Sequence, residues 1–391
     1  MTGVTESQWV VPLSDVVVDD ELRAAVAEAV ESGWWSMGPR VAAFEEAFAS
    51  FCDARHAIAV ANGTAALHLA LLAAGCGEGD EVVLPSLNFV AAANAVRHTG
   101  ARPIFWDIGG DGDLNGDPDD LERAITGATK AVIVLHYAGV PGDLESMLSI
   151  ADRHGLVVIE DAAHAPGGSW RGRMCGTIGA LGCFSFFANK NLPIGEGGMV
   201  VTDDDDLAEA VCRLRSHGMT TLTWDRHRGH AHAYDVVAQG FNYRLDELRA
   251  AMGLVQLARL EDGNEARRML WARYGELLDG TEIALPFRDV PSDTVTAAHI
   301  APVLLPSELD RTKLRESLAS RGIQTSVHYP PIHRFRQYEQ QNERQLPHTD
   351  DVAARLLTLP LYPHMGEAAV ELVVETLLDA AASRVVDARA T

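Results

Sequence analysis

The chain has 391 residues, of which 47% are hydrophobic, and its 55 acidic and 32 basic side chains leave a formal net charge of −23. This composition excludes a mainly disordered chain, and the excess of acid argues against a broad electrostatic grip on nucleic acid or on an anionic membrane. No stretch reaches the roughly 18 apolar residues of a membrane span, and the N-terminus lacks the basic start and apolar core of a secretory signal. The five cysteines are scattered without a CxxC pair, which is typical of reduced thiols in a cytoplasm.

The first elements predicted along the chain are two helices, one from Asp19 to Gly33 and one beginning at Pro39. From residue 57 to about 205, seven short apolar runs follow: 57–60, 81–84, 102–106, 131–135, 156–160, 181–187 and 198–202. Helical stretches separate most of the early runs: 64–74, 88–99, 118–125 and 143–154. This alternation predicts an α/β fold with a mostly parallel seven-stranded sheet and helices on both faces. The last two runs are too close for a helix, so we expect neighbouring strands joined by a functional loop.

The remaining chain is predicted to form two helices and then a mixed segment. The helices run from Asp246 towards Arg259 and over 265–279. After Pro286 we expect a strand near 296–305, a helix near 309–320, a strand at 323–328 and a helix at about 366–378. This pattern indicates a large domain, residues 1–262, and a smaller C-terminal α+β domain, residues 263–391.

Polar residues follow three of the apolar runs, where ligands bind in a sheet of this kind. Gly63 and Thr64 begin a helix whose amide hydrogens, including that of Ala65, would cradle a phosphate, although a plain helix cap is the simpler interpretation. No GxGxxG follows this strand, which argues against a dinucleotide. Asp161 ends a buried strand and needs a partner, for which a protonated ring nitrogen, a helix cap or a salt bridge would serve. Lys190 precedes a glycine-rich turn, where desolvation would make it a nucleophile rather than a surface lysine.

One cofactor, pyridoxal 5′-phosphate, accounts for all three features, because it needs a phosphate cradle, an acid for its pyridinium nitrogen and a lysine for a Schiff base. Four motifs then carry a family resemblance: NGTAAL at 62–67, EDAAHA at 160–165, SFFANKNLPIGEGG at 185–198 and GFNYRLDELRAAMGLVQL at 240–257. In this order they resemble the DegT/StrS family of nucleotide-sugar aminotransferases. The resemblance spans nearly the whole chain and implies the PLP-transferase fold type I.

The resemblance also implies a role for each matching residue. Lys190 would form the Schiff base and act as general base, and Asp161 would pair with the pyridinium nitrogen. The phosphate would be bound by Gly63, Thr64 and Ser185.

Further implied contacts surround the ring and the substrate. Phe89 would stack on the ring and His164 would lie near it. Asn242 and Arg244 would reach the cofactor of a partner subunit, which implies a homodimer with shared active sites. His328 and Tyr329 would belong to the nucleotide-sugar pocket, whereas the role of Asn88 stays open.

The function that follows is transfer of an amino group from L-glutamate to a nucleotide-activated ketosugar by a ping-pong reaction. The GEGG sequence at 195–198 is commoner among relatives that act at the sugar C4, which favours a dTDP-4-keto-6-deoxyhexose. Aminotransfer at C3 or to a keto-cyclitol remains the alternative. Relatives that dehydrate carry histidine in place of Lys190, so dehydration is disfavoured.

A cysteine desulfurase, a non-catalytic sensor and a metal site are the other interpretations of this sequence. A cysteine desulfurase would need a mobile nucleophilic cysteine, and a non-catalytic sensor would need a basic patch or an additional domain. His217, His227, His230 and His232 in the unpatterned stretch 218–242 and beside it have no spacing typical of a metal site. We expect no metal there, and instead a loop beside the active site that contacts substrate phosphates.

Overall fold

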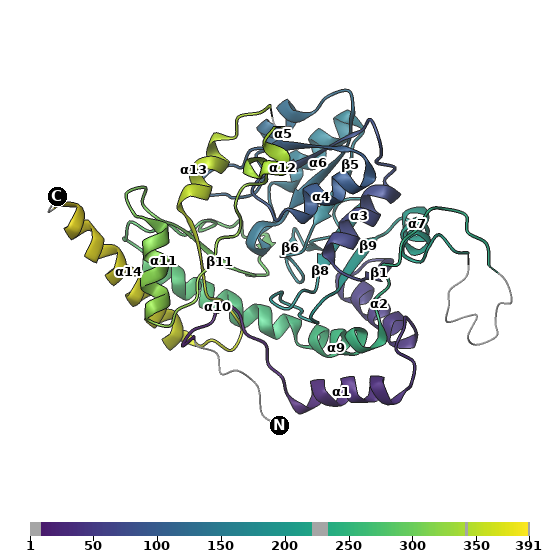
Figure 1. Cartoon of the computed structure of the whole chain (residues 1–391), viewed down its shortest axis with the longest axis horizontal. Coiled ribbons are helices and arrows are strands. Elements are labelled where there is room, and N and C mark those ends of the chain that lie inside the picture. Colours follow the sequence, from purple (N-terminus) through teal and green to yellow (C-terminus); the bar gives the residue numbers. More distant parts are fainter. Residues whose placement is uncertain (1–8, 221–233, 341–342, 390–391) are drawn as a thin grey trace.

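The computed structural model describes residues 9–220, 234–340 and 343–389. Its centre is a seven-stranded sheet in the order β1-β9-β8-β5-β4-β2-β3 (Figure 1). The strands are β1 (His56–Val60), β2 (Glu81–Pro85), β3 (Arg102–Trp106), β4 (Thr129–Leu135), β5 (Val157–Asp161), β8 (Leu181–Ser185) and β9 (Gly198–Thr202). β9 runs antiparallel to β1 and to β8, and the other pairs are parallel. The predicted α/β sheet, with its last two strands adjacent, is therefore confirmed.

Both faces of the sheet are buried because successive strand residues point to opposite sides. In β1, Ile58 and Val60 belong to one apolar cluster and Ala57 and Ala59 to another. The first face is covered by α3 (Gly63–Ala73), α4 (Ala91–Thr99) and α7 (Asp205–Arg215). The second is covered by α2 (Pro39–Cys52), α5 (Pro118–Ala124) and α6 (Leu144–His154). The continuous apolar runs of the sequence follow from this double burial.

Two long helices connect the sheet to the C-terminal part of the chain. α9 (Glu247–Ala258) packs against α1 (Asp20–Glu31) and α2, and α10 (Leu260–Leu278) follows it almost without interruption. Asp246 caps α9 by accepting a hydrogen bond from the amide of Arg249 at 2.9 Å. β10 (Thr294–Val295) joins β6 (Ser169–Trp170) and β7 (Arg173–Met174) in a small second sheet. The proposed domain boundary at residue 262 falls in the first turn of α10.

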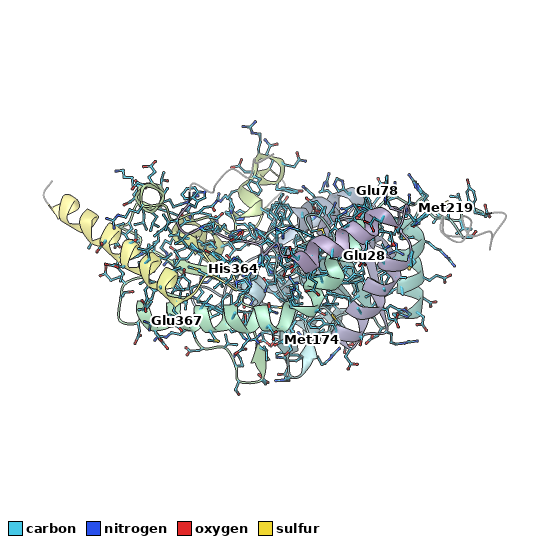
Figure 2. All side chains as sticks on the ribbon, turned by 90° about the horizontal axis from the view of Figure 1, so that it is seen from below. Glu28, Glu78, Met174, Met219, His364 and Glu367 are labelled. Atoms are coloured by element: carbon cyan, nitrogen blue, oxygen red, sulfur yellow. The ribbon has the colours of Figure 1, made fainter. Side chains whose placement is uncertain are left out.

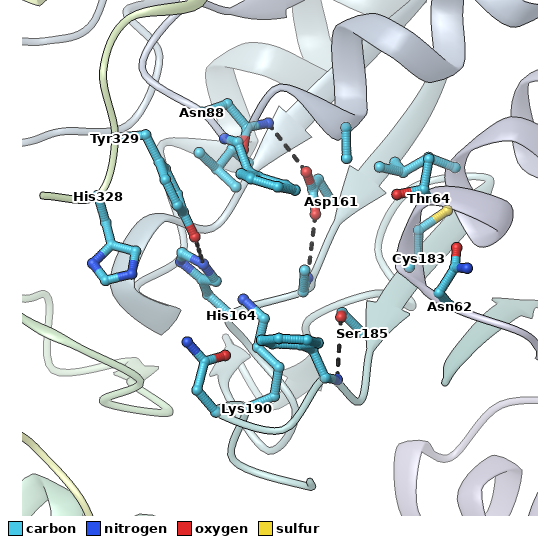
Figure 3. A pocket seen from close by; sticks show the side chains of 18 of the residues that line it. Asn62, Thr64, Asn88, Asp161, His164, Cys183, Ser185, Lys190, His328 and Tyr329 are labelled. Carbon is cyan, nitrogen blue, oxygen red and sulfur yellow. Dashed lines mark hydrogen bonds between the residues drawn. The ribbon is translucent and has the colours of Figure 1, made fainter. Parts of the chain in front are cut away.

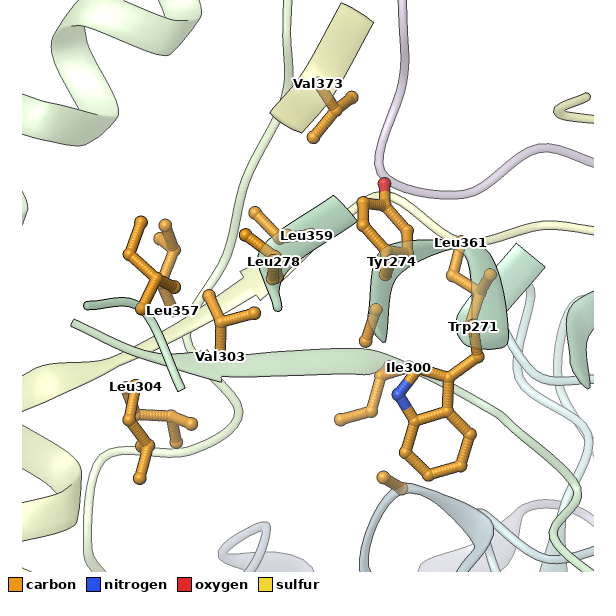
Figure 4. Packing of buried hydrophobic residues seen from close by; sticks show 14 of the residues in the cluster. Trp271, Tyr274, Leu278, Ile300, Val303, Leu304, Leu357, Leu359, Leu361 and Val373 are labelled. Atoms are coloured by element: carbon orange, nitrogen blue, oxygen red, sulfur yellow. The ribbon is translucent and has the colours of Figure 1, made fainter. Parts of the chain in front are cut away.

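The C-terminal part packs into an apolar cluster that it shares with residues of the sheet-bearing part, among them Leu87, Leu135 and Tyr137 (Figure 4). β11 (Ala301–Leu304) and β12 (Leu356–Leu359) pair antiparallel beside α10, α11 (Arg311–Ser320) and α14 (Glu367–Arg389). The prediction of a strand at 323–328 is wrong, because this segment forms only isolated bridges, from Ile323 to Val11 and from Ser326 to Thr358. The partner of β11 is instead β12, a short apolar run that the sequence did not single out.

Short helical segments complete the described chain: η1 (Tyr137–Gly139), η2 (Ile332–Arg334), α12 (Arg336–Glu339) and α13 (Pro347–Arg355). The molecule is elongated, with Met219 near one end and α14 at the other (Figure 2). Within the described residues, no helix is long and apolar enough to cross a membrane.

Candidate active site

A cavity of about 440 Å³ lies beyond the C-terminal ends of the parallel strands (Figure 3). Residues at the ends of β1, β2, β4, β5 and β8 line it, as expected for a ligand site in a sheet of this kind. Nine of the eleven residues predicted from the sequence line this cavity: Gly63, Thr64, Phe89, Asp161, His164, Ser185, Lys190, His328 and Tyr329. The strand ends thus bring together residues that are up to 266 positions apart in the chain, from Gly63 to Tyr329.

One end of the cavity is formed by the N-terminus of α3. The Asn62 side chain caps this helix by accepting a hydrogen bond from the amide of Ala65 at 2.8 Å. The expectation that Ala65 offers its amide to a phosphate is therefore wrong, because the cap already uses it. The amides of Gly63 and Thr64 belong to the first turn, where helix geometry leaves them without an intrahelical acceptor. Together with the Thr64 hydroxyl they form a cradle for an anion.

The cradle is tight because Gly63 lies directly against Ser185. A Cβ atom at Gly63 would lie 2.8 Å from the Ser185 Cβ and 3.2 Å from its Oγ. The absence of a side chain at Gly63 therefore allows the hydroxyl of Ser185 to approach the first turn of α3. This close approach fits a phosphate group held between the two segments.

Replacing Gly63 with alanine is expected to weaken cofactor binding. The added methyl would push Ser185 away, and overpacking of this kind costs about 1–3 kcal/mol, or roughly 5- to 150-fold in Kd. Titration of the cofactor-free protein with pyridoxal 5′-phosphate, followed by absorbance, measures the change. Gly127→Ala is the matched control, because a Cβ there meets nothing within 4 Å; equal affinities of the two variants would contradict the cradle.

Asp161 ends β5, lines the same cavity and is 5% exposed. Its carboxylate accepts hydrogen bonds from Asn88 Nδ2 at 3.1 Å and from the Ala163 amide at 3.3 Å. Burial nevertheless raises the pKa of Asp161, against the effect of these bonds and of the Lys190 charge. A buried carboxylate in this position is stabilised by a protonated partner in the cavity, which fits the ring nitrogen of the predicted cofactor.

Lys190 lies on the loop between β8 and β9, and its side chain points into the cavity (Figure 3). The loop is closed by hydrogen bonds from the Lys190 amide to the Phe187 carbonyl at 2.9 Å and from the Ile194 amide to the Phe186 carbonyl at 3.0 Å. Burial lowers the pKa of Lys190 from 10.5 to about 8, against the opposing effect of Asp161. A larger fraction of neutral amine than in an exposed lysine is therefore present at physiological pH, as a nucleophile for carbonyl carbon requires.

This pKa predicts a distinctive pH dependence for Lys190. The neutral amine reacts with carbonyl compounds, so condensation in the cofactor-free protein should be half-maximal near pH 8 rather than near 10.5. The chain has three lysines, and the other two, Lys130 and Lys313, are exposed. Reductive methylation with ¹³C-formaldehyde therefore gives few lysine signals, and NMR follows the signal of Lys190 as the pH is varied. A Lys190 signal that titrates near pH 10.5 would contradict the buried amine.

The wall beside Lys190 is formed by aromatic and imidazole rings. His164 Nε2 and the Tyr329 hydroxyl are hydrogen-bonded at 2.7 Å, and the Phe89 and Tyr329 ring centroids are 5.6 Å apart. His328 Nδ1 lies 3.0 Å from the Thr358 hydroxyl. Burial and the nearby Lys190 charge lower the pKa of His164 and that of His328. These side chains are therefore neutral and leave Lys190 as the main basic group on this side.

Two predicted residues, Asn242 and Arg244, lie outside this group. Asn242 forms a backbone bridge with Ser216, and Arg244 forms one with Val60 at the end of β1. Neither lines the cavity within the described part of the chain. Their proposed contacts are to a partner subunit, which a single chain does not test.

Three residues near the site were missed or left without a role. Asn88 positions Asp161, since its amide oxygen accepts from the Phe89 amide at 2.6 Å while its nitrogen donates to the carboxylate. Glu160 is fully buried behind the cavity and binds His136 at 2.8 Å and three backbone amides of 176–179. His299 Nε2 lies 3.4 Å from Lys190 Nζ. Glu160 begins the EDAAHA motif at 160–165 and Asn88 precedes the predicted Phe89, whereas His299 lies in no quoted motif.

The cysteines and histidines provide no other reactive centre among the residues described. All five cysteines are unpaired, and burial raises the pKa of each thiol. A cysteine nucleophile of the desulfurase type is therefore disfavoured. No group of three potential metal ligands occurs in the described ranges. His217 is described and its amide donates to the Phe241 carbonyl, whereas His227, His230 and His232 lie outside the described residues.

Comparison of the sequence with models of known protein families identifies the family of this chain. The model of the DegT/DnrJ/EryC1/StrS aminotransferase family matches residues 17–378. The chain belongs to this family. Among curated proteins it is 40% identical over 377 residues to the spore coat polysaccharide biosynthesis protein SpsC of Bacillus subtilis (strain 168), with 94% of this chain and 96% of SpsC covered.

Solved structures of sugar aminotransferases have the same fold as this chain. DesV of S. venezuelae, in complex with a ketimine intermediate, has a TM-score of 0.84 and 37% identity over 91% of this chain and 93% of DesV. DesI, in the presence of its TDP-sugar product, has a TM-score of 0.87 and 32% identity over 99% of this chain and 97% of DesI. Other neighbours were solved in PLP and PMP forms. The chain is a PLP-dependent sugar aminotransferase of fold type I.

Proposed function

We propose that this aminotransferase moves an amino group from L-glutamate to C4 of a dTDP-4-keto-6-deoxyhexose in aminodeoxysugar biosynthesis, for a surface glycan or a natural product such as an antibiotic. The observation that carries the transamination itself is the cavity in which Lys190, Asp161 and the Gly63–Ser185 cradle converge. Each of these three supplies one requirement of pyridoxal 5′-phosphate.

The proposed roles follow from the charge and burial of each side chain. The cofactor, when bound, supplies an electron sink for the charge that develops on the donor's α-carbon. Thr64, Ser185 and the Gly63 amide bind its phosphate, and Asp161 keeps its ring nitrogen protonated. Lys190 would be the residue that holds the cofactor covalently. Once released, Lys190 Nζ, with its pKa of about 8, accepts the proton from the donor's α-carbon as general base. Phe89 and His164 hold the ring from its two sides.

The choice of sugar substrate rests on the sequence of one turn and on one solved relative. The Gly195–Gly198 turn has the sequence that favours action at C4, and DesI, a solved relative, was crystallised with a TDP-sugar product. His328 and Tyr329 line the cavity and are proposed to contact the nucleotide sugar. A C3 ketosugar or a keto-cyclitol is the alternative substrate. It would leave the roles of Lys190 and Asp161 unchanged.

We further propose a homodimer in which Asn242 and Arg244 bind the phosphate of the partner subunit's cofactor. This proposal is supported by the bridge of Arg244 to Val60 at the end of β1, and by the position of both residues outside the cavity of their own chain. The unpaired state of all five cysteines supports a cytoplasmic location.

A product assay tests the function directly. The purified yellow holoenzyme is mixed with L-glutamate, which should bleach the absorbance of the cofactor and release 2-oxoglutarate. A panel of nucleotide 4-ketosugars, nucleotide 3-ketosugars and keto-cyclitols is then added, and the aminated product is identified by mass spectrometry and NMR. Amination of a 4-ketosugar alone supports the proposal, amination of a 3-ketosugar or cyclitol overturns the choice of substrate, and no bleaching by glutamate overturns the choice of donor.

A further inference from the structure

His299 is the residue in closest polar contact with the Lys190 amine in the described chain. Its Nε2 lies 3.4 Å from Lys190 Nζ, and its Nδ1 lies 2.8 Å from the Asn191 side-chain oxygen. His299 precedes β11, and its ring packs on the His164 ring with centroids 4.4 Å apart. The ring is 3% exposed, so its two nitrogens are not satisfied by bulk water.

Two backbone carbonyls determine which atoms of this chain of contacts donate. A carbonyl can only accept, so Asn264 must direct its NH₂ at the Pro166 carbonyl, 2.8 Å away. The Asn264 oxygen then accepts a hydrogen bond from Asn191 Nδ2 at 2.7 Å. The NH₂ of Asn191 also donates to the Ala297 carbonyl at 2.7 Å. The Asn191 oxygen is consequently left as an acceptor facing His299.

This order fixes the tautomer of His299. Because the Asn191 oxygen accepts, Nδ1 of His299 must carry the hydrogen, and the lone pair of Nε2 points toward Lys190. Burial, together with the nearby charges of Lys190 and Arg267, lowers the pKa of His299 well below 6.5. The ring is therefore neutral at physiological pH, and Nε2 is a hydrogen-bond acceptor.

We propose that His299 is a positioning residue whose Nε2 accepts a hydrogen bond from the free amine of Lys190 and holds that amine toward the reacting carbon. Asn191 and Asn264 fix the orientation of the acceptor. The inference rests on the proposed role of Lys190, because positioning matters only when the amine is released. Its action is geometric, and His299 itself exchanges no proton with the substrate.

Two substitutions separate this role from a purely structural one. His299→Asn places an amide nitrogen near the former Nδ1, so it keeps the bond to Asn191 and removes the acceptor facing Lys190. His299→Gln places an amide oxygen near the former Nε2, so it keeps an acceptor and removes the bond to Asn191. If His299 only supports the fold, the glutamine variant is the more damaged; if it positions Lys190, the asparagine variant is.

We expect His299→Asn to lower kcat by at least ~10-fold with little change in KM for glutamate, because displacement of a reacting group by about 1 Å costs up to ~100-fold. His299→Gln should recover most of this loss. In the cofactor-free protein, the ¹³C-methylation titration of Lys190 should move to lower pH in the asparagine variant, since the charged amine loses an acceptor, and should stay near the wild-type position in the glutamine variant. The reverse order of the two variants, or an unchanged Lys190 titration in His299→Asn, would overturn the proposal.

A measurement on the unaltered protein covers the case in which a variant fails to fold. ¹⁵N NMR of histidine in the cofactor-free chain should show His299 neutral with its hydrogen on Nδ1, and a hydrogen on Nε2 would overturn the proposal. Both the titration and the tautomer are measured without turnover. A protein that meets these expectations but does not transaminate would therefore contradict the proposed function and not the contact.

Discussion

Replacing Lys190 with alanine should lower the rate of transamination by about 10⁴-fold, the full contribution of a positioned general base. The variant loses both the amine that reacts with carbonyl carbon and the group that moves the proton at the donor's α-carbon. The cavity keeps its phosphate cradle and Asp161, so the folded protein should still bind pyridoxal 5′-phosphate. Stopped-flow release of 2-oxoglutarate from glutamate measures the loss, and the absorbance spectrum should show cofactor without the lysine adduct.

The control for this variant is Lys130→Ala, which removes an exposed lysine on β4 and should retain wild-type turnover. Circular dichroism and Tm establish that both variants are folded. Burial disfavours the charged form of Lys190, so below pH 8 the charged amine destabilises the cofactor-free protein, and this penalty fades as the pH rises from about 8 to 10.5. The alanine variant should thus be at least as stable as wild type at pH 7. Full activity in Lys190→Ala would end the proposed mechanism.

Asp161→Asn should lower kcat by about 10³-fold, comparable to the loss of one strong electrostatic contact in an active site. The amide has the size of the carboxylate but carries no charge, so it cannot hold a proton on the ring nitrogen of the cofactor. Cofactor affinity should fall as well, and the pH profile of kcat should lose its dependence on that ring proton. Steady-state assays over about pH 6–9, a range that includes the pKa of Lys190 of about 8, measure these effects.

Stability should change in the opposite direction in the cofactor-free Asp161→Asn variant. The pKa of Asp161 is raised above its ordinary value of 3.8 by burial, so the folded chain disfavours the ionised form. The resulting penalty is absent below pH 3.8 and grows as the pH rises through the raised pKa. At pH 8 the asparagine variant should therefore unfold at the same Tm as the cofactor-free wild type or a higher one. A lower Tm together with unchanged kcat would show that Asp161 serves the fold and not the reaction.

The predicted site residues were found largely because they follow strands. Asp161, Ser185 and Thr64 each stand next to the end of an apolar run, and parallel strand ends meet at one edge of a sheet. Lys190 was recognisable because the strands on either side of it are too close for a helix. These features are local in the sequence and therefore readable from it.

The residues that were missed depend on tertiary contacts. His299 is 109 positions from Lys190, and no local pattern connects them. β12 is four residues long and pairs with β11, whereas no strand forms at 323–328, where the sequence predicts one. Which of two short apolar segments pairs with a strand is decided by packing against α10 and α14, and periodicity carries no information about that packing.

The reversed direction of β9 determines how the two halves of the cofactor site are linked. Because β8 and β9 are antiparallel neighbours, the loop that carries Lys190 leaves the sheet at Ser185 and returns at Gly198, which pairs with Ser185. Gly198 also lies against the Asn62 carbonyl, where a Cβ would be only 2.6 Å away. The distance between the phosphate cradle and the Lys190 amine is therefore set by the β8–β9 hairpin, which is anchored where Gly198 pairs with Ser185 and contacts Asn62. Movements of the C-terminal segments that carry His299, His328 and Tyr329 can change what reaches the amine without changing that distance.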